Sequence, residues 1–181
     1  MTRSRLPRSF FARDALVVAP QLLNKVLVAG PCEGRIVEVE AYRSDEPAAH
    51  SFRGPTPRTG VMFGPAGHLY VYFSYGMHHC ANIVTGPDGD GQAVLLRAVR
   101  PLAGIELMSE RRSGRKQLAD GPGKLCQAFG LDLADTGRDL CTNGDLCVVD
   151  DSTPPPDVVL TTPRVGITKA VDLPWRYLVP S

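Results

Sequence analysis

The segment 34–42, with the sequence GRIVEVEAY, alternates between apolar and polar residues. Its apolar positions include Val37, Val39 and Ala41. The polar positions that alternate with them are Glu38, Glu40 and Tyr42. Because successive side chains of a β-strand point to opposite faces, this pattern predicts a half-buried strand. Its polar face would present two carboxylates and an aromatic ring side by side.

Similar patterns predict further strands along the chain. Single strands are expected at 25–29, 92–100 (ending before Pro101), 146–149, 158–160 and 164–167. The segment 68–85 predicts a β-hairpin with its turn near Ser74–Tyr75–Gly76. Gly76 can supply the positive φ that a tight turn requires.

Helices are expected at three places. The first covers 14–23 with Asp14 as its N-cap, the second 102–112, and the third runs from Asp120 to Phe129, before Gly130. Hairpin connections outnumber strand–helix–strand units, which favours an α+β fold. We therefore expect one domain over residues 1–181. It would contain a curved, mainly antiparallel, open-barrel-like sheet, flanking helices and a protruding hairpin.

The segment 45–68 predicts a long loop. Glycine and proline interrupt it at Pro47, Gly54, Pro55, Pro57, Gly60, Gly64, Pro65 and Gly67. A loop of this length is uncommon in a compact domain unless it serves function.

Charge and composition restrict the class of protein only loosely. The net charge is +1, from 20 basic and 19 acidic residues, so the total does not by itself indicate a nucleic-acid partner. No apolar stretch is long enough for a membrane span, and the basic N-terminus lacks the apolar core of a signal peptide. We therefore expect a cytoplasmic protein, nucleoid-associated if bacterial, without a membrane partner.

The cysteine pattern argues against disulfides and against a zinc ribbon. Five cysteines are present, an odd number, and no two have CxxC spacing. We expect reduced and mostly buried thiols.

Two features of the predicted strands point to chemistry. Glu40 and Tyr42 share a face, with Cα atoms roughly 6.5–7 Å apart, so a ring could support a flat ligand while a carboxylate orients water. Tyr75 lies at the hairpin tip, where an aromatic ring can wedge between base pairs. The alternatives are an ordinary solvated strand surface and a ring that folds back over the core.

Together these segments resemble the alkyladenine (3-methyladenine) DNA glycosylase family. The resemblance covers nearly the whole chain, in order, from the opening FFARDALVVAPQLLNKVLV. The matching motifs are RIVEVEAY (35–42), AAHS (48–51), LYVYFSYGM (69–77), CANIV (80–84), AVLLRAVRPLAG (93–104), GPGKLCQAFGL (121–131) and RVGI (164–167).

The resemblance implies roles for five residues around a flipped base. Glu40 would be the general base. Tyr42 would stack on one side of the base, His50 would contact it and hydrogen-bond at its edge, and Tyr72 would stack opposite Tyr42 and His50. Asn82 would line the floor and crowd the exocyclic amine of normal guanine.

Three further residues are expected to contact DNA. The resemblance implies that Tyr75 intercalates at the vacated site and that Arg97 anchors a backbone phosphate. Lys124 stands at the start of the third predicted helix, where free N–H groups suit a phosphate. An ordinary capped core helix is the alternative for Lys124.

The implied activity is hydrolysis of the bond between a damaged purine and its sugar, in double-stranded DNA, by a monomer without cofactor or metal. Extrusion of the base costs a few kcal/mol, which stacking on aromatic rings can return. Alkylation makes the purine cationic and a good leaving group, so a carboxylate that activates water suffices. No lysine nucleophile is required, so strand cleavage is not expected.

Three alternatives stay open from the sequence. Glu38 shares the predicted face and could be the base instead of Glu40. A metal-dependent hydrolase could use His50, His68, His78, His79 and Cys80, although their spacing matches no common ligand motif. A non-catalytic nucleic-acid binding module could be built on a related sheet.

Overall fold

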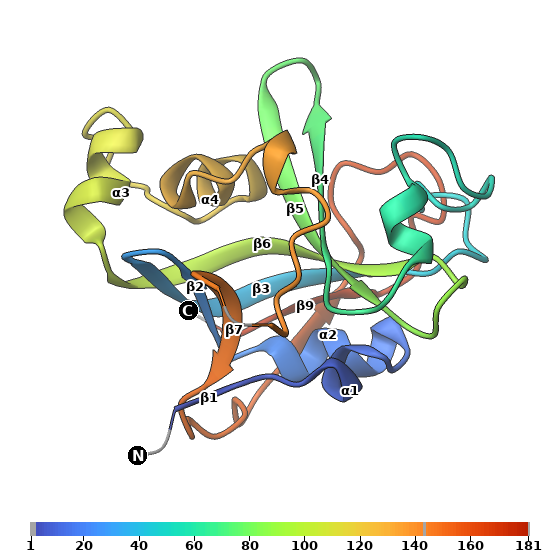
Figure 1. Ribbon diagram of the computed structural model, residues 1–181, viewed down its shortest axis with the longest axis horizontal. Coiled ribbons are helices and arrows are strands. Elements are labelled where there is room, and N and C mark those ends of the chain that lie inside the picture. Colours follow the sequence, from blue (N-terminus) through green and yellow to red (C-terminus); the bar gives the residue numbers. More distant parts are fainter. Residues whose placement is uncertain (1–2, 143, 181) are drawn as a thin grey trace.

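The structure is a computed structural model that describes residues 3–142 and 144–180. Its centre is a curved, nine-stranded sheet in the order β1-β7-β2-β3-β6-β5-β4, with β9 pairing to β3 and β8 (Figure 1). The strands are β1 (Ser4–Arg5), β2 (Val26–Ala29), β3 (Cys32–Tyr42), β4 (Leu69–Ser74), β5 (His78–Thr85), β6 (Gln92–Ala103), β7 (Leu146–Asp150), β8 (Leu160–Thr162) and β9 (Arg176–Leu178). The pairings between these strands are antiparallel, so the expected α+β class and curved antiparallel sheet are confirmed.

The α-helices pack on one face of this sheet. They are α1 (Arg8–Phe11), α2 (Ala15–Leu22), α3 (Ile105–Arg111) and α4 (Pro122–Phe129). Two short 3₁₀ helices are η1 (Gly60–Phe63) and η2 (Leu133–Asp135), and η1 lies on the opposite face, where its Met62 packs against Tyr70. Side chains of α2 and α4 join the same hydrophobic core as Ile36, Val39 and Ala41 of β3. The opposite face of β3, β6, β5 and β4 is therefore left for the polar side chains.

The predicted faces of β3 are correct at its end and wrong at Val37. Val37 is only half-buried, whereas Ile36 is fully buried. Irregular pairing with β6 between Ile36 and Val39 inserts an extra residue, which exchanges the faces on either side of it. Glu38, Glu40 and Tyr42 nevertheless share the face that the alternation predicts. Two observations show this: the Tyr42 hydroxyl donates a hydrogen bond to Glu40, and the Arg97 guanidinium contacts both glutamates.

Capping explains where two of the helices begin and end. The Asp14 side chain accepts a hydrogen bond of 2.9 Å from the Leu16 backbone N–H, as expected for the N-cap of α2. Pro122 opens α4, and Gly130 ends it with a φ of 69°. Both predicted helices are therefore confirmed, with α4 beginning two residues later than expected.

Other element boundaries differ from the sequence patterns. β6 continues through Pro101 to Ala103, and α3 begins only after Gly104, which has a φ of 71°. The expected strand at 158–160 lies at Leu160–Thr162 instead. The expected strand at 164–167 is wrong: this segment is irregular, and the last strand of the sheet is β9. Short strands such as β1 and β9 depend on pairing partners, which a local pattern does not reveal.

The expected long loop is confirmed, with η1 as its one helical turn among the described residues. In Figure 1 this loop and the segment between β8 and β9 gather at the same end of the sheet. The five cysteines are free, and four of them are buried. Every helix in the described ranges is too short or too polar to cross a bilayer.

Candidate active site

A cavity of about 670 Å³ lies on the polar face of the sheet. Strands β3, β4, β5 and β6 supply its floor, and the long loop and the segment 165–169 supply its sides. Side chains at its wall include Tyr42, His50, Tyr72, Asn82 and Arg97. The structure therefore brings together residues from five separate motifs of the sequence.

Glu40 lies directly behind this wall, with a side chain that is 0% exposed. Its Oε2 accepts a hydrogen bond of 2.8 Å from the Tyr42 hydroxyl. Its Oε1 accepts one of 2.8 Å from the Val165 backbone N–H and lies 3.2 Å from Nη1 of Arg97. A carboxylate has about four acceptor positions, so these three donors fix its orientation and leave about one position unfilled.

Glu38 has a different environment from Glu40. Its Oε1 accepts hydrogen bonds of 2.6 Å from Arg97 and 2.7 Å from Arg176. Burial alone would raise the pKa of Glu38, but the hydrogen bonds from Arg176 and Arg97 outweigh burial and lower it. Glu38 is thus an ion-paired carboxylate held between two guanidinium groups, whereas all three partners of Glu40 line the cavity.

Arg97 joins the two carboxylates. Burial alone would lower its pKa, but the attraction of Glu40 and the hydrogen bond to Glu38 raise it. Its guanidinium is therefore charged, 13% exposed and already paired. The expected phosphate contact of Arg97 stays a prediction, and a phosphate would have to share this guanidinium with the two glutamates.

His50 and Tyr72 form one ring pair at the wall. Their centroids are 4.5 Å apart with an angle of 71° between the planes, an edge-to-face contact. Nδ1 of His50 lies 3.0 Å from the Tyr70 hydroxyl. The two rings touch, so a base cannot lie between them as they stand. The structure therefore places His50 with Tyr72, whereas the resemblance led us to expect it with Tyr42.

Burial keeps these rings uncharged near neutral pH. It raises the pKa values of Tyr42 and Tyr72, with a further contribution from Glu40 to that of Tyr42. It lowers the pKa of His50, and nearby Arg58 lowers it further. The cavity therefore presents neutral aromatic surfaces in front of the buried carboxylate of Glu40.

Tyr42 is supported from one side by a residue to which sequence reasoning gave no role. The guanidinium carbon of Arg164 lies 4.6 Å from the centroid of the Tyr42 ring. This cation–π contact covers one face of the ring. Because Tyr42 also lines the cavity, its opposite face is left for a ligand.

Asn82 lies on the floor and is 5% exposed. Its Nδ2 donates a hydrogen bond of 3.1 Å to the backbone oxygen of Tyr70, its partner on β4. This bond fixes the side-chain amide on the floor of the cavity.

Tyr75 is placed quite differently, at the end of the β4–β5 hairpin that projects from the body of the molecule (Figure 1). Its side chain is 82% exposed and its φ is 50°. Met77, also at the tip, is 69% exposed, and the Tyr75 side chain lies at the rim of the cavity. The alternative in which the tip ring folds back over the core is not what the structure shows.

Lys124 does not line the cavity, although Pro122 and Gly123 of the same helix turn do. Its ammonium donates hydrogen bonds of 2.9 Å to both Asp120 and Gln117. It borders a second hollow of about 530 Å³, whose other lining residues are Arg112, Arg115, Lys116 and Gln117.

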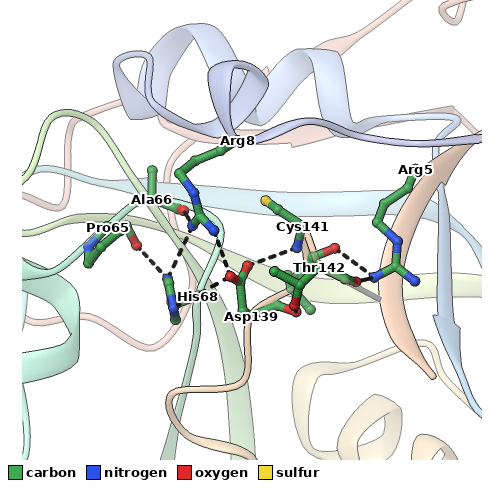
Figure 2. Close-up of polar contacts among 9 residues, drawn as sticks. Arg5, Arg8, Pro65, Ala66, His68, Asp139, Cys141 and Thr142 are labelled. Atoms are coloured by element: carbon green, nitrogen blue, oxygen red, sulfur yellow. Dashed lines mark hydrogen bonds and ion pairs between the residues drawn. The ribbon is translucent and has the colours of Figure 1, made fainter. Parts of the chain in front are cut away.

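The side chains of the metal hydrolase alternative do not gather at one point. Figure 2 shows His68 beside Asp139 and Arg8, where its Nδ1 lies 2.8 Å from the Pro65 oxygen. Arg8 donates to Asp139 at 2.6 Å, so this cluster ties α1 to the segment before β7. His79 instead packs on Phe73, with ring centroids 5.0 Å apart. Over residues 3–142 and 144–180, no three His, Cys, Asp or Glu side chains are grouped to hold a metal ion.

The fold and the site define a protein with a curved antiparallel sheet and an aromatic cavity backed by a buried carboxylate. The sequence profile of the methylpurine-DNA glycosylase family matches residues 9–181. The chain belongs to this family.

Three relatives agree with the assignment. A protein of Burkholderia lata is 52% identical over 181 residues, covering 97% of this chain and 87% of its own length. Proteins of Methanoculleus marisnigri and Carboxydothermus hydrogenoformans are 51% and 47% identical over 180 residues, covering 95% of this chain and 93% of their own. All three are named 3-methyladenine DNA glycosylase, a name given provisionally in each case.

Proposed function

We propose that this protein hydrolyses the N-glycosidic bond of an alkylated purine that is flipped out of double-stranded DNA. The observation that supports this most is the placement of Glu40. It is fully buried, held by three donors, and lies directly behind a wall of neutral aromatic rings.

The flipped base would lie between Tyr42 on one side and the His50–Tyr72 pair on the other. Stacking contributes roughly 1–3 kcal/mol per base, and a desolvated cationic base gains about 2 kcal/mol from the rings. These terms offset the few kcal/mol needed to extrude the base. Asn82 on the floor would crowd the exocyclic amine of normal guanine and so favour adenine-like bases.

Catalysis would consist of water activation beside a developing sugar cation. The acceptor position left on Glu40 would hold the water, and the carboxylate would take its proton as the oxygen attacks the anomeric carbon. The same negative charge would stabilise the oxocarbenium character of the transition state. The products are a free alkylated purine and an abasic site, because no amine of the protein takes part.

The central experiment incubates the wild-type protein and Glu40→Gln with methylated duplex DNA and separates the released bases by chromatography. Glutamine keeps the shape: its oxygen can accept from Val165 and Arg97, and its amide can donate to the Tyr42 hydroxyl. We expect hydrolysis to fall at least about 100-fold while duplex binding stays within a few-fold of wild type. Glu33→Gln is the matched control on the same strand, since Glu33 pairs with Arg3 away from the cavity. Unchanged base release by Glu40→Gln would overturn the role of Glu40, and binding without release by wild type would favour the non-catalytic module.

A second assay tests whether the reaction stops at the abasic site. Lys169 lines the cavity rim and is the amine to examine as a competing nucleophile. Borohydride added during turnover traps a lysine–sugar adduct if one forms. We expect free base, an intact strand and no covalent protein–DNA complex.

A further inference from the structure

The segment behind Tyr42 contains a buried ion pair that the proposed chemistry does not use. The side chains of Arg164 and Glu46 are 0% and 5% exposed. Nη1 and Nη2 of Arg164 donate to Oε1 and Oε2 of Glu46 at 2.6 and 3.0 Å, a bidentate contact. Nη1 also donates to the Ala41 backbone oxygen at 3.0 Å.

Burying two charges is a poor way to gain stability, because the cost of removing them from water can exceed their attraction. A pair of well-packed apolar residues would hold the segment at least as well. Nε of Arg164, moreover, is buried without a hydrogen-bond partner in the described part of the chain. A role in positioning the neighbouring groups explains the pair better than stability does, because a planar guanidinium with a bidentate contact fixes both distance and orientation.

Three contacts show what that geometry fixes. The guanidinium carbon lies 4.6 Å from the Tyr42 ring and 5.1 Å from the Trp175 ring, so it is held against both. Glu46 also accepts a hydrogen bond of 2.8 Å from the Ala48 N–H, two residues before His50.

The residue after Arg164 completes the set. Val165 donates its backbone N–H to Oε1 of Glu40, so the position of Arg164 determines where that donor points. One guanidinium is thus connected to the catalytic carboxylate, to the ring on one side of the base and to the loop that holds the ring on the other.

We infer that Arg164 is a positioning residue of the base cavity, which through Glu46, Tyr42 and Val165 fixes the distance between the two aromatic walls and the orientation of Glu40. This inference rests on the proposed function. It adds that the RVGI segment and the long loop act as one unit, clamped by a single side chain.

The test compares Arg164→Lys and Glu46→Gln with Arg35→Lys. Lysine keeps the charge but loses the planar, bidentate contact. Arg35 is a matched control, because it makes the same kind of contact with Asp151, at 3.2 and 2.8 Å, and also donates to a backbone oxygen, that of Asn24. Arg35 does not line the cavity.

We expect Arg164→Lys to lower the single-turnover rate of base release about 10- to 100-fold, the cost of displacing reacting groups by about 1 Å. Affinity for undamaged duplex should stay within about threefold. Arg164→Lys should have less effect in the Glu46→Gln background, since the two residues act through one contact. The control should lose comparable stability to urea and keep the wild-type rate.

Trp175 supplies a readout that does not need DNA. It is the single tryptophan of the chain, so its fluorescence reports on the ring that Arg164 contacts. We expect emission to change in both Arg164→Lys and Glu46→Gln and not in Arg35→Lys. An unchanged rate in Arg164→Lys, or an equal loss in the control, would overturn the inference. If wild type releases no base, the proposed function fails. In that case the positioning role of Arg164 can still be judged separately, because unchanged Trp175 emission in both variants would overturn it.

Discussion

Two tyrosines that face the same cavity are held in opposite ways. Tyr42 donates its hydroxyl to Glu40 at 2.8 Å and has a guanidinium 4.6 Å from its ring centroid. Tyr75 stands at the hairpin tip with 82% of its surface exposed. One ring is part of the packed structure, and the other is placed by backbone alone.

The difference separates two requirements of the proposed reaction. Groups near the reacting bond must already be in position, because reorganising them during the reaction would raise the barrier. A group that enters the duplex must instead reach beyond the protein surface. Such a ring adds little to folding, since its apolar area is not buried before DNA binds. We therefore expect substitutions at the wall to affect stability and catalysis together, and substitutions at the tip to affect catalysis alone.

The largest effect is expected for Tyr42→Ala. This change removes a stacking surface for the base, a donor to Glu40 and the ring on Arg164. We expect the rate of base release to fall about 100-fold or more, because the variant loses stacking worth roughly 1–3 kcal/mol and also loses the hydrogen-bond donor to Glu40. The free energy of unfolding should fall by about 3 kcal/mol. Single-turnover kinetics and urea unfolding measure the two losses. Tyr42→Phe keeps the ring and should preserve most of both, and an inactive but fully stable Tyr42→Ala would contradict the coupling.

A smaller and purely functional effect is expected for Tyr75→Ala. Stability to urea should change by less than about 0.5 kcal/mol, because the ring is exposed. Release from duplex should fall about tenfold, since the gap left by the base is no longer filled. The same lesion in a single strand needs no wedge and should react at the wild-type rate. Equal losses on both substrates would show that the ring serves some other purpose than opening the duplex.

These two positions also show how far the sequence alone leads. Alternation over 34–42 placed Glu40 and Tyr42 on one face, and a turn signal at Gly76 placed Tyr75 at a tip. Both expectations depend only on local geometry, the twofold period of a strand and the φ of a turn. The structure bears out both placements, whereas the chemical roles of these residues stay predictions.

The segment 164–167 shows where such reasoning ends. Its pattern predicted a strand, yet it is irregular and buries an arginine. What holds it is the contact with Glu46, 118 residues away in the sequence, and no local signal reports a partner at that distance. The contact of His50 with Tyr72 was not predicted for the same reason, because it depends on how the long loop folds back.

The smallest effect is expected for Lys124→Ala. Lys124 lies neither in the wall of the cavity nor at the hairpin tip, so it adds a third kind of position to the comparison. Lys124 is partly exposed, less so than Tyr75, and it is paired like Tyr42, since its ammonium is bonded to Asp120 and Gln117. Pro122 and Gly123 in the same turn line the cavity, so the backbone of a flipped nucleotide would pass within reach of it.

A phosphate that displaces Asp120 from Lys124 should release about one counterion. The slope of log affinity against log salt should therefore fall by about 0.9 in Lys124→Ala, with only a few-fold loss at any one salt concentration. Lys25→Ala is the control, because Lys25 also pairs with an aspartate, Asp150 at 2.7 Å, but is not a cavity residue. Binding titrations at several salt concentrations give the slopes. If Lys124→Ala and wild type have the same slope, the start of α4 is only a capped helix. A partly exposed lysine that is already paired would then contribute neither to the cavity nor to the affinity for DNA.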